Sequence, residues 1–482
     1  MRSSCKIWPA TVLALFFLAT SVDAFEIRGR VADLSMDEVV WTPQDFAGFY
    51  YDIDHDVGDE TLTLELSDKP TFLAFASLRD YPRGIVYQAN INQVKGLSTA
   101  KEGMVYGKLT VASIDSTTGK IILDNKDNQT TLSKNRKIEL MPGFGIKTAD
   151  QDATAANPMR FYIYREVTEP GTYELRGTVA SLVNGSFTWS PQNFAGFYYD
   201  LNKNIGTETL TLSPTTNDGT TVTISDEYNE NGMRGLVYET RSQPKNFKFA
   251  SWGSYQIIGF LGEPYFVAYN MTTTPQMASR GEQGIPYLFD RSKNRNLMTY
   301  EQISKILMDD DTNKLVKKGE SLKLKEGYEL LLKGVSSEGQ VYLQLLKEGQ
   351  VIDESFLYPS VSGATMVDKT YYYRSDFGDM KDIAVIAVHF RGTYRDEEQA
   401  LAKVDGIWQI SETSTSIRLD KQYGKMDIRQ VDPVALRITM ENKDNPINLS
   451  RNIDVELMPS IYLRTADNET LRYYIYRTET IT

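Results

Sequence analysis

The chain has 482 residues, of which 41% are hydrophobic and 24% are charged, and its formal net charge at pH 7 is −12. This acidic balance argues against nucleic acid and anionic membranes as partners, because both repel a negative surface. A chain of this length can bury the cores of two or three domains without help from disulfides.

The first 24 residues (1–24) are typical of a cleaved secretion signal. Arg2 and Lys6 give a basic start, and an apolar run at 11–19 precedes a small-residue cleavage point. The run is shorter than the roughly 20 residues that span a bilayer, which favours a signal over an anchor. The only cysteine, Cys5, lies in this segment. We therefore expect a secreted mature chain with no disulfide and no membrane span of its own.

A stretch of 24 residues occurs twice without a gap, at 41–64 and 189–212. Sixteen of the 24 positions are identical, at a constant offset of 148. The shared pattern reads W-[TS]-P-Q-[DN]-F-A-G-F-Y-Y-D and then G-x-E-T-L-T-L. Within the first copy, the aromatic run at 46–51 predicts a strand, 52–58 a turn and 61–64 a half-buried strand. A match this long indicates an internal duplication.

The two copies differ by one large insertion. In the first copy only the short segment 88–105 separates Tyr87 from Tyr106, whereas the long segment 239–422 separates the equivalent Tyr238 from Tyr423. Beyond these points the copies match again, through N-K-D-N, E-L-M-P, T-A-D and R-[FY]-Y-I-Y-R. Insertions are tolerated where the two ends of the interrupted segment lie close together. The beginning and end of each copy should therefore form one β-domain, and the extra residues should form another.

These boundaries predict an all-β protein of tandem β-sandwich domains. We expect a first repeat at 25–168 that consists of the framework domain alone. The second repeat, at 169–482, is expected to combine a framework (169–238 plus 423–482) with an insert at about 239–422.

The insert is predicted to be mostly β with one or two short helices. Its strand-like runs lie at 255–261, 265–269, 328–333, 341–346, 351–357 and 383–388. Thr299 and Gln302 have capping-box spacing, which predicts a helix that ends at 309–311. A second short helix is predicted over 396–403.

The chain shows none of the common catalytic motifs. The mature part has two histidines, His55 and His389, which lie far apart in the repeat scheme. There is no Gly-x-Ser-x-Gly elbow, His-Glu-x-x-His pair or P-loop. We expect a protein that is not an enzyme and needs no cofactor, although the scattered carboxylates leave a glycosidase pair open.

The duplicated turns carry oxygen ligands spaced by two, which resemble the start of a calcium loop. The candidate metal ligands are Asp52, Asp54, Asp56, Asp200, Asn202 and Asn204. In both turns the glycine falls one place late and no glutamate occupies the twelfth position, so a solvated turn is the alternative. The carboxylates at 309–311 form a second candidate cation site, because they would face the negative end of the predicted helix.

Five sequons are candidate surface glycosylation sites in a secreted chain, of which we expect two or three to carry a glycan. Their asparagines are Asn128, Asn184, Asn270, Asn448 and Asn468.

Together, the repeated motifs resemble the S-layer duplication-domain family of methanogenic archaea, typified by Methanosarcina surface-layer tile proteins. Stretches of the insert at 307–312, 324–330, 368–373 and 405–411 add to the resemblance. It implies a secreted, N-glycosylated β-sandwich protein of the cell surface that contacts itself or related S-layer proteins laterally in a lattice. It implies no catalytic residues. The alternative is a soluble secreted β-sandwich protein that binds glycans or a cell surface.

Overall fold

The predicted all-β class is confirmed by the computed structural model, which consists of antiparallel sheets with very little helix. The predicted signal and Asn270 lie outside the described residues. The structure describes residues 25–66, 75–78, 84–93, 96–126, 128, 130–150, 157–217, 221–224, 235–269, 288, 296–377, 380–396, 399–442 and 445–481.

The first repeat contains two larger sheets and one short pair of strands. The sheet orders are β1-β13-β12-β11, with β2 also paired to β13, then β3-β4-β6-β9-β8-β7, and β10-β5. Since β1 pairs with β13, the beginning and end of this repeat lie in one sheet. The bounds are β1 Phe25–Arg28, β2 Ala32–Asp33, β3 Glu38–Trp41, β4 Thr61–Glu65, β5 Phe75–Leu78, β6 Ile85–Asn90, η1 Ile91–Gln93, β7 Val105–Tyr106, β8 Leu109–Asp115, β9 Lys120–Asp124, β10 Thr130–Ser133, β11 Lys137–Met141, β12 Phe144–Thr148 and β13 Arg160–Val167.

Outside its insert, the second repeat has the same strand order in its two larger sheets, and its smallest sheet has one more described strand, β18. The sheets are β14-β39-β38-β37, with β15 paired to β39, then β16-β17-β20-β35-β34-β33, and β18-β19-β36. Here β14 pairs with β39, so the beginning and end of the repeat again share a sheet. The bounds are β14 Gly171–Arg176, β15 Ala180–Ser181, η2 Leu182–Asn184, β16 Phe187–Trp189, β17 Glu208–Leu212, β18 Thr215–Asn217, β19 Thr221–Ile224, β20 Leu236–Arg241, β33 Gln422–Tyr423, β34 Met426–Asp432, β35 Arg437–Glu441, β36 Ile447–Asn448, β37 Asp454–Met458, β38 Ile461–Thr465 and β39 Arg472–Ile481.

The insert is built from an eight-stranded and a four-stranded sheet. Their orders are β21-β22-β23-β24-β32-β31-β30, with β25 paired to β32, and β26-β27-β28-β29. The bounds are β21 Gln243–Asn246, η3 Ala250–Trp252, β22 Ser254–Phe260, β23 Glu263–Tyr269, η5 Leu297–Tyr300, β24 Gln302–Asp310, β25 Lys314–Lys317, β26 Ser321–Lys323, β27 Tyr328–Val335, β28 Val341–Lys347, β29 Gln350–Leu357, α2 Met366–Lys369, β30 Thr370–Phe377, β31 Met380–Arg395 and β32 Ala400–Ser416.

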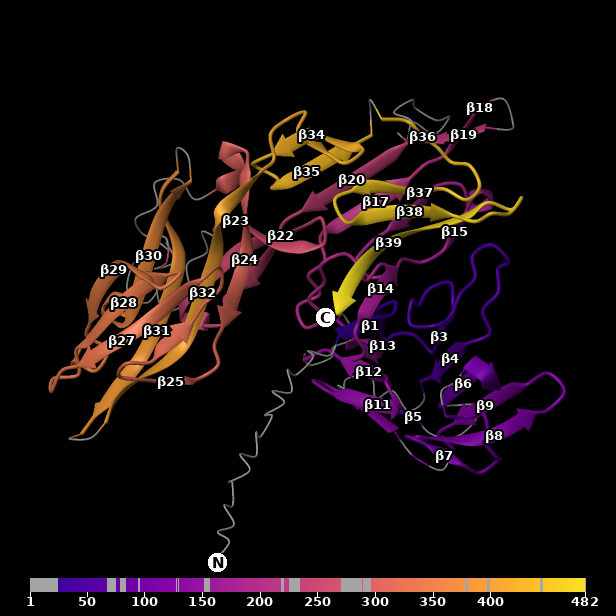
Figure 1. The fold of residues 1–482 in the computed structure, drawn as a ribbon, viewed down its shortest axis with the longest axis horizontal. Coiled ribbons are helices and arrows are strands. Elements are labelled where there is room, and N and C mark those ends of the chain that lie inside the picture. Colours follow the sequence, from indigo (N-terminus) through magenta and orange to yellow (C-terminus); the bar gives the residue numbers. More distant parts are fainter. Residues whose placement is uncertain are drawn as a thin grey trace, which may run out of the picture.

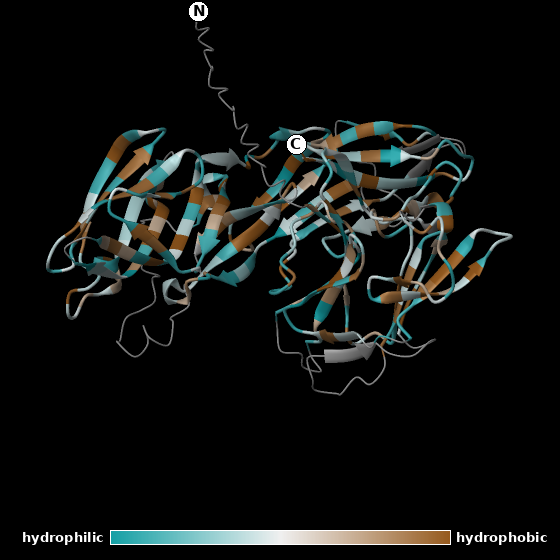
Figure 2. Ribbon diagram, turned by 60° about the horizontal axis from the view of Figure 1, so that its bottom comes forward, coloured by the Kyte–Doolittle hydropathy of each residue, from teal (hydrophilic) through white to brown (hydrophobic). Residues whose placement is uncertain are grey.

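Three large clusters of buried residues centre on the first repeat, on the other sheets of the second repeat and on the insert, and the second of these clusters also includes insert residues such as Phe260 and Ile303. In Figure 1 the insert extends to the left, the other sheets of the second repeat lie at the upper right, and the first repeat lies below them. Apolar and polar residues alternate along many strands, as expected for sheets with one buried face (Figure 2). The duplicated Trp41 and Trp189 are fully buried in the cores of the first and second repeat.

The duplicated stretch folds differently from the prediction at one point. The predicted turn at 52–58 is confirmed by the Asp52–Val57 bridge, and the following strand is β4. The predicted strand at 46–51 is wrong, because this segment forms successive turns. The rings of Phe46 and Phe49 pack edge to face at 4.8 Å, so the aromatic run folds back into its own core instead of pairing along a sheet.

Both helices predicted in the insert are wrong. Residues 302–310 form β24, which lies between β23 and β32 in the larger sheet. Strand pairing on both edges and burial of Ile303 outweigh a weak local helix signal. Within 396–403, the strand β32 already begins at Ala400. The α-helix that the structure does describe is α2, where Thr365 and Asp368 form a capping box.

Candidate functional site

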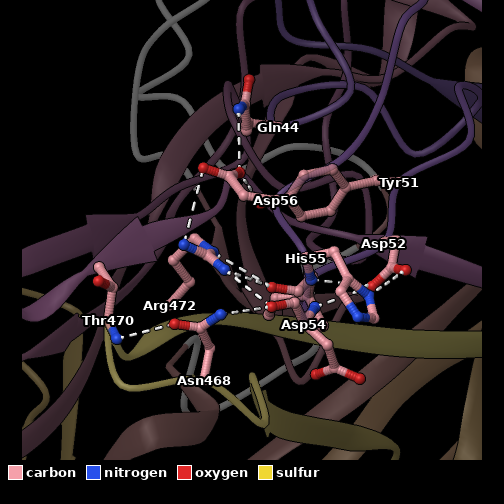
Figure 3. A network of polar contacts seen from close by, with 10 residues as sticks. Gln44, Tyr51, Asp52, Asp54, His55, Asp56, Asn468, Thr470 and Arg472 are labelled. Atoms are coloured by element: carbon pink, nitrogen blue, oxygen red, sulfur yellow. Dashed lines mark hydrogen bonds and ion pairs between the residues drawn. The ribbon is translucent and has the colours of Figure 1, made fainter.

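The two duplicated turns lie where the first and second repeats contact each other. The turn at 52–58 belongs to the first repeat but contacts β39 and the residues before it in the second (Figure 3). The turn at 200–206 belongs to the second repeat and contacts β13 and Asp150 of the first. We call this reciprocal region the inter-repeat contact.

In one half of the contact, Arg472 holds the main chain of the first turn. Its guanidinium donates to the carbonyl of Ile53 at 3.1 and 3.0 Å and to that of Asp54 at 3.1 Å. The Asp467 N–H donates to the Asp54 carboxylate at 2.7 Å, and the Asn468 amide donates to the Asp54 carbonyl at 2.8 Å. Figure 3 shows Arg472 and Asn468 converging on this turn.

The other half repeats this arrangement with the roles of the repeats exchanged. Arg160 donates to the carbonyl of Leu201 at 3.2 Å and to that of Asn202 at 3.3 Å. The Asp150 N–H donates to the Asn202 side-chain oxygen at 2.8 Å. Arg160 and Arg472 both open the motif R-[FY]-Y-I-Y-R. The same residues therefore meet the same turn twice, as in a twofold, isologous interface.

Two further arginines, one from each repeat, make equivalent contacts with the opposite repeat. Arg28 of the first repeat lies 5.2 Å from the ring centre of Tyr199, and Arg176 of the second lies 5.1 Å from that of Tyr51. Each guanidinium also donates a 3.3 Å hydrogen bond to a main-chain carbonyl in the aromatic run of the other repeat. Arg176 is buried and Arg28 is partly buried, so water screens these cation–π contacts only weakly.

The main chain adds one matching hydrogen bond on each side. The Val31 N–H donates to the Gln192 carbonyl at 2.9 Å, and the Val179 N–H donates to the Gln44 carbonyl at 2.8 Å. Both glutamines belong to the duplicated W-[TS]-P-Q motif. Part of the repeated pattern thus serves the contact between the repeats.

The first set of predicted cation ligands contacts protein donors. Asp52 accepts from the N–H groups of Asp54 and His55 and from the His55 ring at 2.8 Å. Through this contact the Asp52 carboxylate raises the pKa of His55. Asp56 accepts from the Tyr51 hydroxyl at 2.7 Å, and its φ of 55° is a left-handed conformation that Asp and Asn tolerate.

The second set behaves in the same way. Asp200 accepts from the Asn202 N–H and pairs with Lys245 at 2.9 Å, while Asn204 accepts from the Tyr199 hydroxyl at 2.9 Å. Across the described ranges, no three His, Cys, Asp or Glu side chains are grouped to hold a metal ion. Turn geometry and the inter-repeat contact account for the spacing of these residues, and calcium binding stays a prediction.

The second candidate cation site loses its basis, because 309–311 do not end a helix. Asp309 is half-buried and accepts from the Lys248 N–H at 2.9 Å and the Tyr255 hydroxyl at 3.2 Å. Asp310 pairs with Lys314 at 2.7 Å. Of the two histidines, His389 is buried, stacks on Phe249 and bonds Asp405 at 2.6 Å.

Each repeat also contains a buried glutamate that fixes the aromatic run. Glu208 accepts from the Tyr198 N–H at 2.9 Å, the Tyr238 hydroxyl at 2.9 Å and the Gly262 N–H at 2.8 Å. Its counterpart Glu60 makes equivalents of the first two bonds. Burial raises the pKa of Glu208 to about 7 and also raises the pKa of Glu60.

Glu208 should make stability depend on pH. A carboxyl whose folded pKa exceeds its unfolded value near 4.5 stabilises the fold most below pH 4.5 and progressively less up to about pH 7. Compared with Glu208→Gln, the wild type should therefore lose about 3 kcal/mol of unfolding free energy between these pH values. Denaturant unfolding of both proteins from pH 4.5 to 8 measures this difference. A difference that stays constant with pH would contradict the assignment.

Sequence reasoning missed the arginines of the inter-repeat contact and the buried glutamates, whereas it singled out Asp54, Asn202 and Asn468 for other roles. No catalytic or metal-binding pattern includes these arginines and glutamates. The signal that could have found them is the duplication itself, since all of them recur at equivalent positions. The pairs are Arg28 and Arg176, Glu60 and Glu208, and Arg160 and Arg472.

The same duplicated stretches decide the family. The sequence model of the family described as "S-layer protein" matches residues 31–95 and 180–467, which contain both copies of the stretch. This chain belongs to the S-layer protein family. The resemblance to a family of structural surface-layer proteins is therefore confirmed.

Three relatives named "Major S-layer protein" come from Methanosarcina species. That of Methanosarcina acetivorans is 31% identical over 409 residues, which are 81% of this chain and 54% of the relative. That of Methanosarcina barkeri is 29% identical over 93% of this chain and 62% of the relative. That of Methanosarcina mazei is 30% identical over 78% and 50%. This S-layer family chain thus spans about half to three fifths of the relatives' length.

Within the part of this family member that the structure describes, no helix is both long and apolar enough to cross a bilayer.

Proposed function

We propose that this chain is a structural component of an S-layer at the cell surface, where it contacts itself or related S-layer proteins laterally. The observation that carries the proposal is the family match across both copies of the repeat. The names of the relatives support it, since each is a major S-layer protein. The protein would act by assembly and not by catalysis.

We also propose that 25–168 and 169–482 are two copies of one module, with the insert at about 239–422. The shared strand order of their sheets supports this division. The inter-repeat contact would give the pair a fixed geometry, because arginines and main-chain hydrogen bonds join them from both sides. A lattice needs such rigid units, since closed or repeating contacts form only when each subunit presents the same surfaces.

The association state of residues 25–482 tests the structural role. Light scattering and negative-stain microscopy would be carried out with and without calcium, and with a Methanosarcina major S-layer protein added. We expect sheets, or co-assembly with the added protein, through interfaces of at least about 1,000 Å². A chain that stays monomeric under all these conditions would overturn the lattice role and favour a soluble secreted protein that binds glycans or a cell surface.

N-linked glycans are proposed at exposed sequons of this chain. Asn128 and Asn448 are exposed: Asn128 precedes β10 and Asn448 ends the equivalent strand β36, although the Asn128 amide donates a long 3.3 Å bond to the Lys108 carbonyl. Asn468 is half-buried and its amide nitrogen, the atom that a glycan modifies, donates to Asp54 in the inter-repeat contact. The side chain of Asn184 and all of Asn270 lie outside the described residues.

Glycopeptide mass spectrometry of the native protein should find glycans on Asn128 and Asn448 and an unmodified Asn468. A sugar at Asn468 would have to fit between the two repeats, where Arg472 already holds the same turn. The variant Arg472→Met would keep the sequon unchanged and remove the side chain that holds the same turn, so it serves as a control for access to Asn468. Full occupancy of Asn468 in the wild type would contradict the prediction.

A further inference from the structure

In the second repeat, a hairpin turn of the insert is bound in a site beside the aromatic run at 194–199. We call the groups that contact this turn its receptor groups. The turn is Leu261–Gly262, between β22 and β23, and both residues have positive φ (53° and 82°), as in a two-residue type I′ hairpin. The Leu261 N–H donates to the Tyr238 hydroxyl at 3.2 Å, and the Gly262 N–H donates to Glu208 at 2.8 Å. Figure 1 shows β22 reaching from the insert toward β17 and β20.

Side chains complete the recognition of this turn. Arg477 donates to the Leu261 carbonyl at 3.4 Å and pairs with Glu263 at 3.1 Å. The ring of Phe260 lies between Tyr238 and Tyr423, at 6.2 and 5.3 Å from their centres. A side chain on Gly262 would come within 2.4 Å of both the Arg477 guanidinium and the Gly196 carbonyl, so only glycine fits there.

The first repeat has the same receptor groups around an open cavity of about 720 Å³, within the usual size range of ligand sites. Its walls include Glu60, Tyr87, Tyr106 and Arg165, the counterparts of Glu208, Tyr238, Tyr423 and Arg477. Arg176 of the second repeat also lines the cavity. Between β6 and β7 the described residues form η1 and turns, so they supply no hairpin like β22–β23.

Glu60 and Tyr87 of this cavity are arranged as Glu208 and Tyr238 are around the bound turn, whereas Arg165 has a different hydrogen-bond partner from Arg477. Glu60 accepts from the Tyr50 N–H at 2.8 Å and the Tyr87 hydroxyl at 2.7 Å. Among the described residues, nothing takes the place of the third donor that Gly262 gives to Glu208. Arg165 donates to the Gly48 carbonyl at 2.8 Å. The site is therefore preorganised for a turn with main-chain donors and a carboxylate.

We propose that the cavity of the first repeat binds a two-residue β-hairpin turn of another polypeptide, with the pattern aromatic-apolar-Gly-Glu. The aromatic ring would enter between Tyr87 and Tyr106, the glycine would approach Gly48, and the carboxylate would pair with Arg165. The turn at 261–262 already occupies the site in the second repeat of its own chain. The same holds in every other molecule of this protein, so none of them presents this turn free. The partner is therefore a different protein that presents such a turn unoccupied. Binding of this turn does not require lattice formation.

The probe for this proposal is a backbone-cyclised, fluorescent peptide that copies residues 258–265. Fluorescence anisotropy with the full chain should show saturable binding. Arg165→Met should weaken the affinity at least 10-fold by removing the partner of the peptide carboxylate, and Tyr106→Ala should weaken it similarly by removing one aromatic wall. A peptide with valine in place of Gly262 should lose binding, because its added side chain meets the arginine and the glycine carbonyl.

Arg451→Met provides the matched control, since Arg451 is an exposed arginine that does not line the cavity and should leave the affinity unchanged. Melting curves of each variant would show that the fold is retained. The proposal would be overturned by a peptide that fails to saturate, or by equal affinities for the wild type, Arg165→Met and Tyr106→Ala. Equal binding of the valine peptide would overturn it as well.

Discussion

The double variant Arg160→Met/Arg472→Met is expected to lower the unfolding free energy by about 5 kcal/mol, because hydrogen bonds to charged groups are lost on both sides of the inter-repeat contact. Each arginine donates to two main-chain carbonyls of the opposite turn. Methionine keeps most of the apolar stem, so the loss comes mainly from the guanidinium groups. The repeats should also separate more easily than in the wild type, because the two substitutions remove the Arg160 and Arg472 hydrogen bonds from both halves of the reciprocal contact.

Denaturant unfolding combined with small-angle X-ray scattering measures both effects, since multidomain chains can unfold in more than one step. The radius of gyration should rise in the double variant before either core unfolds. Arg451→Met is the matched control, because this exposed arginine pairs with Glu469 at 3.6 Å and should change stability by less than about 0.5 kcal/mol. Scattering identical to the wild type would show that other contacts hold the repeats together.

Glu208→Ala should destabilise the chain at pH 6 by about 4 kcal/mol, because several buried donors lose their acceptor at once. These donors are the N–H groups of Tyr198 and Gly262 and the hydroxyl of Tyr238. Each unpaired buried donor costs about 1 to 3 kcal/mol. Glu60→Ala should cost less, because Glu60 accepts the two equivalent bonds from the Tyr50 N–H and the Tyr87 hydroxyl and faces a cavity that water can enter.

Thermal and denaturant unfolding of the two alanine variants, side by side, provides the measurement. Glu239→Ala is the control, since Glu239 lies on the neighbouring strand β20 in a partly exposed pair with Arg437 at 3.7 Å. Equal losses at Glu60 and Glu208 would mean that the bond from Gly262 contributes little. The insert would then be held to the second repeat mainly by its other contacts.

Most of the strand layout could be predicted because its signals are local. Alternating residues located β4, strand-like runs located the insert strands β22, β23, β27, β28 and β29, and polar, glycine-containing segments located turns between them. The duplication supplied a second, independent copy of the signal for β4. Where the local signal was ambiguous, pairing with distant strands prevailed. The capping-box spacing before Gln302 is present, but pairing with β23 and β32 makes the segment a strand.

The order of the amino acids was enough to establish a duplicated, all-β protein with one insertion, because a gapless repeat and strand periodicity can be recognised from neighbouring residues alone. The docking of each turn on the other repeat emerged only in the folded chain. Arg472 contacts Ile53 from the far end of the sequence, and no local pattern specifies such a contact. The open cavity also depends on the tertiary structure. The β22–β23 turn fills the site of the second repeat, and no described residues fill the equivalent site of the first repeat.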